Sequence, residues 1–194
     1  MPVATLYDIH GNLRALEAVL AEIPDDATIV VGGDVCVGGE RPGETLELLR
    51  SLGERVVWVR GNADREPVPE LTAEQFAFLQ ALPPSALLDG TLYVHASPRN
   101  DEDIFTERTP EARIALLFED VDADVVVCGH THMQFDRVVG GKRVLNSGSV
   151  GMPYEEEPGA YWTLDLVHRR TPYEGATLLA SRDEALATFT ERGL

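Results

Sequence analysis

The chain has 194 residues, 44% of them apolar, and its 16 Lys and Arg against 33 Asp and Glu give a formal net charge of −17. This length and apolar content predict one domain with a substantial core, residues 1–194, while so acidic a chain should repel nucleic acids and anionic membranes. Because the N-terminus has no signal-peptide pattern and no apolar run approaches the roughly 20 residues of a membrane helix, we expect a cytoplasmic protein without a stable nucleic-acid or membrane partner.

Short apolar runs alternate with segments of helical spacing through the first two-thirds of the chain. The nearly continuous β-branched runs predict strands buried on both faces, at residues 3–7, 27–31, 55–59, 91–94 and 124–128. Apolar positions three and four apart predict helices between them, at residues 12–23, 44–52, 72–82 and 110–120. The remaining chain predicts a hairpin turning at Gly140–Gly141, strands at 161–167 and 176–180, and a helix at 182–191. Together these elements indicate an α/β layered domain whose C-terminal third is mostly antiparallel.

Polar side chains follow the predicted strands at the points where the strands end. Seven of them are candidate ligands and include four of the five histidines: Asp8, His10, Asp34, Asn62, His95, His130 and His132. Loops that leave the carboxyl ends of strands in an open α/β sheet converge on one crevice. Residues two apart in an extended segment also project to the same side, which applies to Asp8 with His10 and to His130 with His132. We therefore expect these side chains to meet at one edge of the sheet.

Imidazole, carboxylate and amide oxygen together suit divalent transition metals better than calcium, which prefers oxygen ligands alone. Manganese, iron, cobalt, nickel and zinc all fit this donor set. Seven donors are too many for one tetrahedral site and suit two ions about 3.5–4 Å apart. The pattern thus predicts a site for two metal ions.

Five ordered motifs carry a resemblance to a known family. They are Asp-x-His-Gly-Asn from residue 8, Gly-Asp at 33–34, Gly-Asn at 61–62, a single His at 95, and Gly-His-Thr-His at 129–132. In order and approximate spacing they resemble the calcineurin-like metallophosphoesterase superfamily, over residues 6 to about 151. The small size and the lack of inserted domains are similar to its compact bacterial and archaeal phosphodiesterase branch. The resemblance implies a four-layer sandwich of two packed mixed β-sheets flanked by helices.

The resemblance also implies roles for the candidate ligands. It assigns Asp8, His10 and His132 to one metal and Asn62, His95 and His130 to the other, with Asp34 as the bridge. Asp34, Asn62 and His95 would be the catalytic residues. The cofactors would be two divalent ions, manganese first among them, and a hydroxide that bridges them would attack phosphorus.

One motif departs from the family pattern. Many relatives have His directly after the Asn of the third motif, where it is thought to protonate the leaving group, but this chain has Ala63. The branch that the chain resembles also lacks this His and favours phosphodiesters. We therefore expect a hydrolase that cleaves phosphodiester bonds of a small substrate. Two alternatives stay open. A phosphatase of phosphoproteins or dinucleotide polyphosphates would usually keep the His, and a non-catalytic metal-binding scaffold would tend to lose ligands.

Other polar residues near these motifs are candidates for substrate contacts. Arg99 and Asn100 follow His95 closely and could clamp a phosphate, although a solvated loop is an equal alternative. Arg65 flanks the Asn62 loop and is a third candidate. For Asn12 we consider a helix N-cap and a ligand contact. A sheet edge or the apolar C-terminal third are candidate surfaces for a homo-oligomer.

Overall fold

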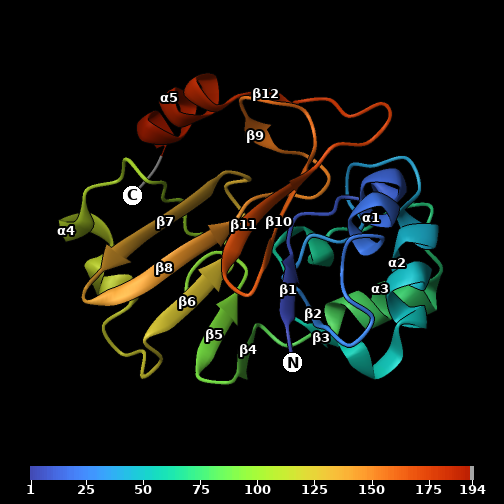
Figure 1. Ribbon diagram of the computed structural model, residues 1–194, viewed down its shortest axis with the longest axis horizontal. Helices are drawn as coiled ribbons and strands as arrows, with labels where there is room; N and C mark the ends of the chain where they lie inside the picture. The colour runs from blue at the N-terminus through green and yellow to red at the C-terminus, as the bar shows by residue number, and fades with distance from the viewer. Residues whose placement is uncertain (193–194) are drawn as a thin grey trace.

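Two five-stranded mixed sheets pack face to face, and helices cover both outer faces (Figure 1). The computed structural model describes residues 1–192, with the side chains of the last helix described up to residue 189. The arrangement confirms the predicted four-layer sandwich. Among the described residues, none of the helices has the length and apolar character that crossing a bilayer would require.

The first sheet has the strand order β11-β10-β1-β2-β3. Its members are β1 (Val3–Leu6), β2 (Thr28–Val31), β3 (Val56–Trp58), β10 (Ala160–Leu164) and β11 (Val167–Thr171). Strands β1, β2 and β3 run parallel, whereas β10 is antiparallel to both β1 and β11. The late strands therefore extend a sheet that the N-terminal third begins.

The second sheet has the strand order β4-β5-β6-β8-β7. Its members are β4 (Ser85–Leu88), β5 (Thr91–Val94), β6 (Val125–Cys128), β7 (Gln134–Val139) and β8 (Lys142–Ser147). Strands β5, β6 and β8 are parallel, and β4 and β7 pair with them antiparallel at the two edges. The β7–β8 hairpin turns at Gly140–Gly141, as predicted. A separate parallel pair joins β9 (Tyr154–Glu155) to β12 (Ala180–Ser181).

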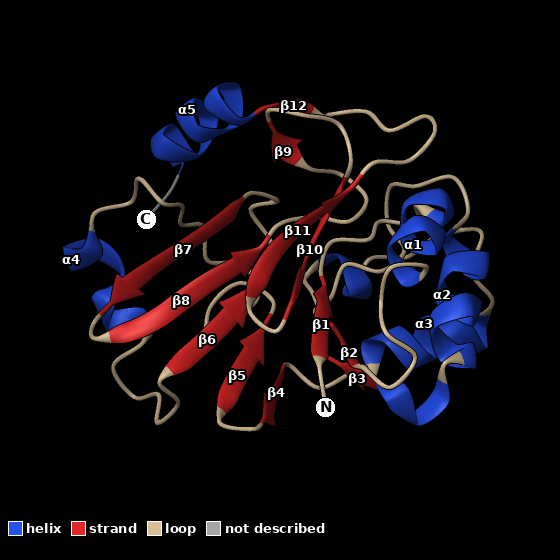
Figure 2. Cartoon of the chain, in the orientation of Figure 1, coloured by secondary structure: helices blue, strands red, loops and turns tan. Residues whose placement is uncertain are grey.

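The helices lie on opposite sides of the sandwich, as Figure 2 shows. The outer face of the first sheet is covered by α1 (Leu13–Leu20), α2 (Pro42–Ser51) and α3 (Ala73–Gln80). The second sheet is covered by α4 (Glu111–Ile114) and the 3₁₀ turn η3 (Ala115–Leu117). Two further 3₁₀ turns are η1 (Gly53–Arg55) and η2 (Ala63–Arg65), and the last described helix is α5 (Arg182–Arg192). Helix α3 begins with the capping box of Thr72 and Gln75.

Strand β2 illustrates why the predicted strands are apolar at nearly every position. Ile29 and Val31 face the helices, while Val30 faces the second sheet. The layer between the sheets is formed by Tyr7, Val30, Val59, Tyr93, Val127 and Leu145. Successive side chains of a strand point to opposite faces, so a strand in the middle of such a sandwich must be apolar on both.

Three predicted elements differ from the structure. The segment 161–167 is not one strand, because Asp165 and Leu166 have φ of 51° and 60° and form a two-residue turn between β10 and β11. The helix at 110–120 is wrong in its length: one α-helical turn ends at Ile114 and a 3₁₀ turn follows. Of the strand expected at 176–180 only its last residue is extended.

Candidate metal centre

All seven candidate ligands follow the carboxyl ends of strands at one edge of the sandwich. Asp8 and His10 follow β1, Asp34 follows β2 and Asn62 follows β3, while His95 follows β5 and the last two histidines follow β6. In Figure 1 the arrows of β1, β5 and β6 point toward the same end of the molecule. Strands of both sheets thus contribute ligands to one cluster, whereas the sequence predicted that the ligands would meet at the edge of a single sheet.

The side chains form two groups of three, each with its ligand atoms within 4.8 Å of one another. One group is Asp8, His10 and His132, and the other is Asp34, His95 and His130. Asp34 contacts both, because its Oδ2 lies 3.4 Å from Nε2 of His95 and 4.0 Å from Nε2 of His10. Asn62 belongs with the second group, since its Oδ1 lies 3.0 Å from Nε2 of His95. The assignment of each ligand to one of two metal ions stays a prediction.

Backbone carbonyls fix which nitrogen of each histidine faces the centre. A carbonyl oxygen can only accept, so Nδ1 of His10, His95 and His132 must carry the hydrogen that it donates to Val37, Gly32 and Met152 respectively. In a neutral ring the Nε2 atom then presents a lone pair. The three Nε2 atoms therefore all present acceptors, not donors, to the cluster.

When all three rings are neutral, these acceptors face one another without hydrogen atoms between them. Nε2 of His10 lies 3.2 Å from Nε2 of His132, and Oδ1 of Asp8 is buried with no hydrogen-bond partner among the described residues. The Asp8 oxygen lies 3.4 Å from His132 Nε2 and 3.9 Å from His95 Nε2. Lone pairs at these distances repel unless a cation or a proton lies between them. The donor set thus fits divalent metal ions, in type and in arrangement.

In the absence of a cation, protons would occupy the space between these lone pairs. The pKa values of His95 and His130 then lie far from the usual range of histidine. Burial disfavours a charged ring, yet the adjacent Asp34 carboxylate outweighs it and raises the pKa of His95 to about 10. The opposite holds at His130, where burial and the charge of His95 lower the pKa to about 4. The same centre thus holds one imidazole that attracts a proton and one that rejects it, and a metal ion that bound there would displace a proton from His95.

The backbone around the cluster is held in unusual conformations. Five of the seven candidate ligands have positive φ although none is glycine: Asp8 52°, His10 51°, Asp34 55°, His130 66° and His132 58°. Glycines allow the loops to approach closely. A Cβ on Gly61 would lie 2.2 Å from Oδ1 of Asp34, and one on Gly129 would lie 2.6 Å from Oδ2 of Asp8. Outside the cluster, positive φ at non-glycine residues occurs only in turns among the described residues, at Asp89, Asp165 and Leu166.

Asp64 joins two of the ligand loops. Its buried carboxylate accepts backbone hydrogen bonds from Gly61 at 2.8 Å, Val35 at 2.9 Å and Asp34 at 3.0 Å. Burial, with the Asp34 charge, raises the pKa of Asp64 to about 6. The hydrogen-bond partners of this carboxylate are thus backbone N–H groups of the two loops.

The three predicted substrate contacts have partners inside the protein. The Arg65 guanidinium pairs with Asp101 at 2.6 Å and with Glu102 at 2.8 Å. Arg99 pairs with Asp103 at 2.7 Å, and Asn100 Oδ1 accepts from the backbone N–H of the same aspartate. These contacts stabilise the loop after β5. A role in substrate binding stays a prediction for all three residues.

The carbonyls of Val37 and Met152 contribute to the site and could not be found in the sequence. They orient His10 and His132, but every residue has a carbonyl, so the sequence pattern does not identify the ones that act here.

For Asn12 the N-cap alternative holds, because its Oδ1 accepts from the backbone N–H of Ala15. Its Nδ2 also donates to Tyr173, which lies 161 residues away and gave no signal.

Known proteins share this fold and these motifs. Residues 1–169 match the model of the calcineurin-like phosphoesterase superfamily domain. The chain is 31% identical to phosphodiesterase YfcE of Escherichia coli strain K12 over 173 residues, which are 81% of this chain and 84% of the relative. It is 27% identical to the uncharacterized protein MJ0912 of Methanocaldococcus jannaschii, over 76% of this chain and 69% of the relative.

Solved structures agree. A metallophosphoesterase from Sphaerobacter thermophilus superposes with a TM-score of 0.76 at 26% identity, over 100% of this chain and 95% of the other. The E. coli phosphoesterase YfcE superposes with a TM-score of 0.55 at 26% identity, over 84% of this chain and 87% of the other. With the family model covering most of its length, the chain belongs to the calcineurin-like phosphoesterase superfamily.

Proposed function

We propose that this protein is a phosphodiesterase that uses two divalent transition-metal ions, manganese first among them, to hydrolyse a small phosphodiester. Asp8, His10 and His132 would hold one ion, and Asn62, His95 and His130 the other. Asp34 would be shared by both. Two such ions supply a nucleophile from water at neutral pH and neutralise the charge that develops on the phosphoryl oxygens.

What most supports this function is the set of unpaired lone pairs in the cluster. Oδ1 of Asp8 is buried without a hydrogen-bond partner, and Nε2 of His10 and His132 face each other at 3.2 Å, all among the described residues. Buried acceptors without donors are costly, at about 1–3 kcal/mol each, unless a cation compensates them. Such an arrangement is unfavourable in a protein that binds no cation there.

The residues of the chain would keep the cluster rigid during the reaction. Ala63 donates its backbone N–H to Oδ1 of Asp34 at 2.8 Å, which leaves Oδ2 directed at the histidines. His130 donates its backbone N–H to Oδ2 of Asp8 at 2.8 Å and leaves Oδ1 directed inward. Each carboxylate thus has one oxygen held by the backbone and one available to a metal.

The preference for diesters rests on the residue directly after Asn62. The methyl side chain of Ala63 is buried and offers no proton to a leaving group. Loss of a positioned proton donor typically costs roughly 10²–10⁴-fold with a poor leaving group and far less with a good one. The name of the relative YfcE, a phosphodiesterase, supports the same preference.

The decisive assay compares bis-p-nitrophenyl phosphate with p-nitrophenyl phosphate after chelator stripping and re-addition of Mn²⁺. We expect turnover that depends on Mn²⁺ and favours the diester, with two ions bound per chain by elemental analysis. His132→Gln should lose turnover and bind fewer ions. His168→Gln is the matched control, because His168 contacts the Asn146 carbonyl outside the cluster.

Each other outcome would support a different function. A clear preference for the monoester would favour a phosphatase. Binding of two ions without turnover of either ester would favour a metal-binding scaffold, and binding of a single ion would contradict the dinuclear site.

A further inference from the structure

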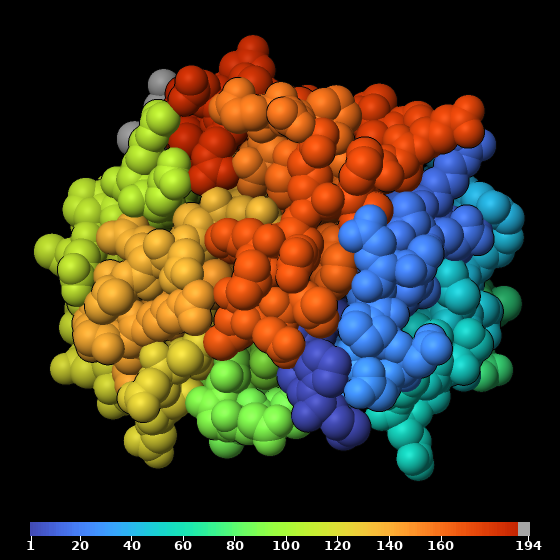
Figure 3. Space-filling view, in the orientation of Figure 1, coloured from blue at the N-terminus to red at the C-terminus, as the bar shows by residue number. Residues whose placement is uncertain are grey.

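A cleft of about 430 Å³ opens beside the metal centre, at His10. Its walls come from four segments: the first turn of α1, the loop at 38–41, residues 151–152 after β8, and the segment 173–179 between β11 and β12. We call it the Arg14 cleft. Figure 3 shows the orange-red chain that follows β11 against the blue surface of α1 at this edge of the molecule. A volume of this size is within the range of small-molecule sites.

Asn12 and Tyr173 form the inner wall of the Arg14 cleft. Nδ2 of Asn12 donates to the carbonyl of Gly151 at 3.1 Å and to the hydroxyl of Tyr173 at 3.0 Å. The hydroxyl therefore accepts one hydrogen bond, and its own hydrogen has no acceptor among the described residues. The ring of Tyr173 packs against the apolar core, which holds the hydroxyl in place. The wall thus offers one fixed hydrogen-bond donor.

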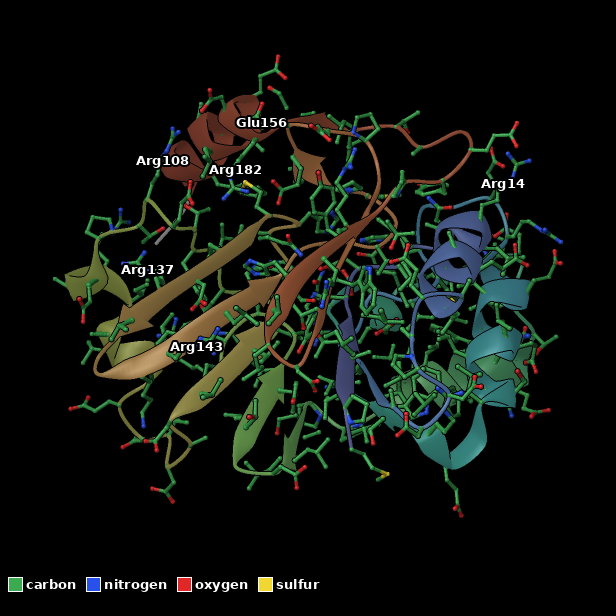
Figure 4. The ribbon with its side chains drawn as sticks, viewed as in Figure 1. Arg14, Arg108, Arg137, Arg143, Glu156 and Arg182 are labelled. Atoms are coloured by element: carbon green, nitrogen blue, oxygen red, sulfur yellow. The ribbon has the colours of Figure 1, made fainter. Side chains whose placement is uncertain are left out.

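Arg14 supplies a positive charge on the same side. Figure 4 shows it at the outer end of α1, beside the segment that joins β11 to β12. Its Nη1 lies 3.6 Å from where a Cβ on Gly175 would be, so the guanidinium is directed along the cleft wall. No hydrogen bond or ion pair joins this guanidinium to another described residue. It is therefore available to a ligand.

The other charged residues of the cleft differ from Arg14. Arg41 is paired with Glu44, with Nε 2.8 Å from Oε1. Glu40 lies on the same loop as Arg41, is exposed, and contributes one negative charge to the opposite wall. Arg14 is also in the first turn of α1, where the helix dipole disfavours a cation and where no acidic residue lies in the same turn. The helix dipole therefore gives no reason for an arginine at this position.

We infer that the Arg14 cleft holds one alcohol arm of the diester, and that Arg14 and the Tyr173 hydroxyl recognise an anionic oxygen group on that arm. The inference rests on the proposed function, since the scissile phosphate would lie at the metal centre. The group is a carboxylate or a phosphate, both of which accept the forked hydrogen bonds of a guanidinium. The substrate would thus be a phosphodiester with a second anionic group, not a neutral dialkyl ester.

Four p-nitrophenyl phosphodiesters test this with the Mn²⁺-loaded protein. Their second arms are propyl, 2-carboxyethyl, 2-phosphoethyl and 2-aminoethyl, so that the two anionic arms distinguish a carboxylate from a phosphate. We expect kcat/KM for the ester with one of the anionic arms to exceed kcat/KM for the propyl ester by about three- to tenfold. This range corresponds to the strengths of an exposed ion pair and of a charge-assisted hydrogen bond. The kcat/KM for the aminoethyl ester should not exceed that for the propyl ester.

Two variants and a control assign the preference to its residues. Arg14→Gln should abolish the preference, so that kcat/KM for the ester with the anionic arm equals that for the propyl ester of the same variant, and Tyr173→Phe should reduce the preference in part. Arg169→Gln is the control, because Arg169 is an exposed arginine of β11 that does not line the cleft and has no side-chain partner among the described residues. The control should retain the full preference.

Calorimetry supplies a readout that needs no turnover. 2-Carboxyethylphosphonate should bind more tightly than propylphosphonate to the wild type and the Arg169→Gln variant, and equally weakly to Arg14→Gln. Equal binding of the two phosphonates by the wild type, no binding of either at millimolar concentration, or a preference that survives in Arg14→Gln would overturn the inference. So would a preference for the aminoethyl arm. Absence of turnover with all four esters would contradict the proposed function, and calorimetry would still decide the cleft.

Discussion

Replacing Gly61 with alanine should damage the metal centre through one methyl group. The added Cβ would lie 2.2 Å from Oδ1 and 2.6 Å from the backbone nitrogen of Asp34. Carbon and oxygen atoms in contact need more than 3 Å, so the Asp34 loop must move by about 1 Å. The backbone of Gly61 does not have positive φ, and the effect is therefore steric.

Overpacking of this kind typically costs about 1–3 kcal/mol. For a chain of this size we expect a melting temperature lower by about 2–12 °C. A shift of 1 Å in a catalytic ligand also costs on the order of 10²-fold in rate. Loss of both stability and Mn²⁺-dependent turnover is thus the expected result, measured by thermal unfolding in chelator and by the diester assay.

Gly43→Ala is the matched control, because it adds the same methyl group where there is room. The new Cβ would meet nothing closer than 3.7 Å, and the residue lies in α2. Alanine in a helix is better than glycine by about 0.5–1 kcal/mol, so this variant should be slightly stabilised and fully active. If Gly61→Ala behaved like Gly43→Ala, the close approach of the two loops would not be essential.

Three other variants test separate features. Asp64→Asn should change the pH dependence of stability, because an acid whose folded pKa is raised from 3.8 to about 6 loses stability as pH rises through that window, on the order of 3 kcal/mol. His130, with its pKa lowered to about 4, contributes the opposite slope to both proteins, so urea unfolding in chelator should show that stability rises more between pH 4 and 6.5 in the variant than in the wild type. An equal change in the two proteins would contradict the raised pKa of Asp64. Asp34→Asn should abolish turnover and weaken binding of both ions; a full complement of two ions would exclude its bridging role. Ala63→His should raise activity on p-nitrophenyl phosphate, and an unchanged rate would mean that the pocket, not a missing acid, limits monoester hydrolysis.

The strands and the candidate ligands were predictable because local signals determine both. A strand buried on two faces needs a continuous apolar run, and β2 and β6 have one. The turn between β7 and β8 was marked by two glycines, whereas Asp165 and Leu166 reach positive φ without one and gave no sign of a turn. Turn prediction thus succeeded where glycine marks the conformation and failed where tertiary contacts impose it.

The substrate side of the site was harder to predict for a different reason. The acidic partners of Arg65 and Arg99 are adjacent in sequence at 101–103, yet composition cannot rank an internal ion pair against a phosphate contact. Arg14 and Tyr173 are brought together only by the folded sandwich, since they are far apart in the chain. Spacing identifies ligands on neighbouring strand ends and does not identify a cleft made by four segments.

The left-handed backbone at five of the candidate ligands has an evolutionary consequence. A residue other than glycine costs roughly 1–2 kcal/mol in this conformation, so five of them together carry several kcal/mol, a large share of the 5–15 kcal/mol that stabilises a typical domain. Glycine would relieve this strain, but at Asp8 and Asp34 it would also leave the backbone N–H groups of His130 and Ala63 without their buried acceptors. A lineage that no longer needed the centre would therefore gain stability at these two positions only where it also replaced the lost hydrogen bonds.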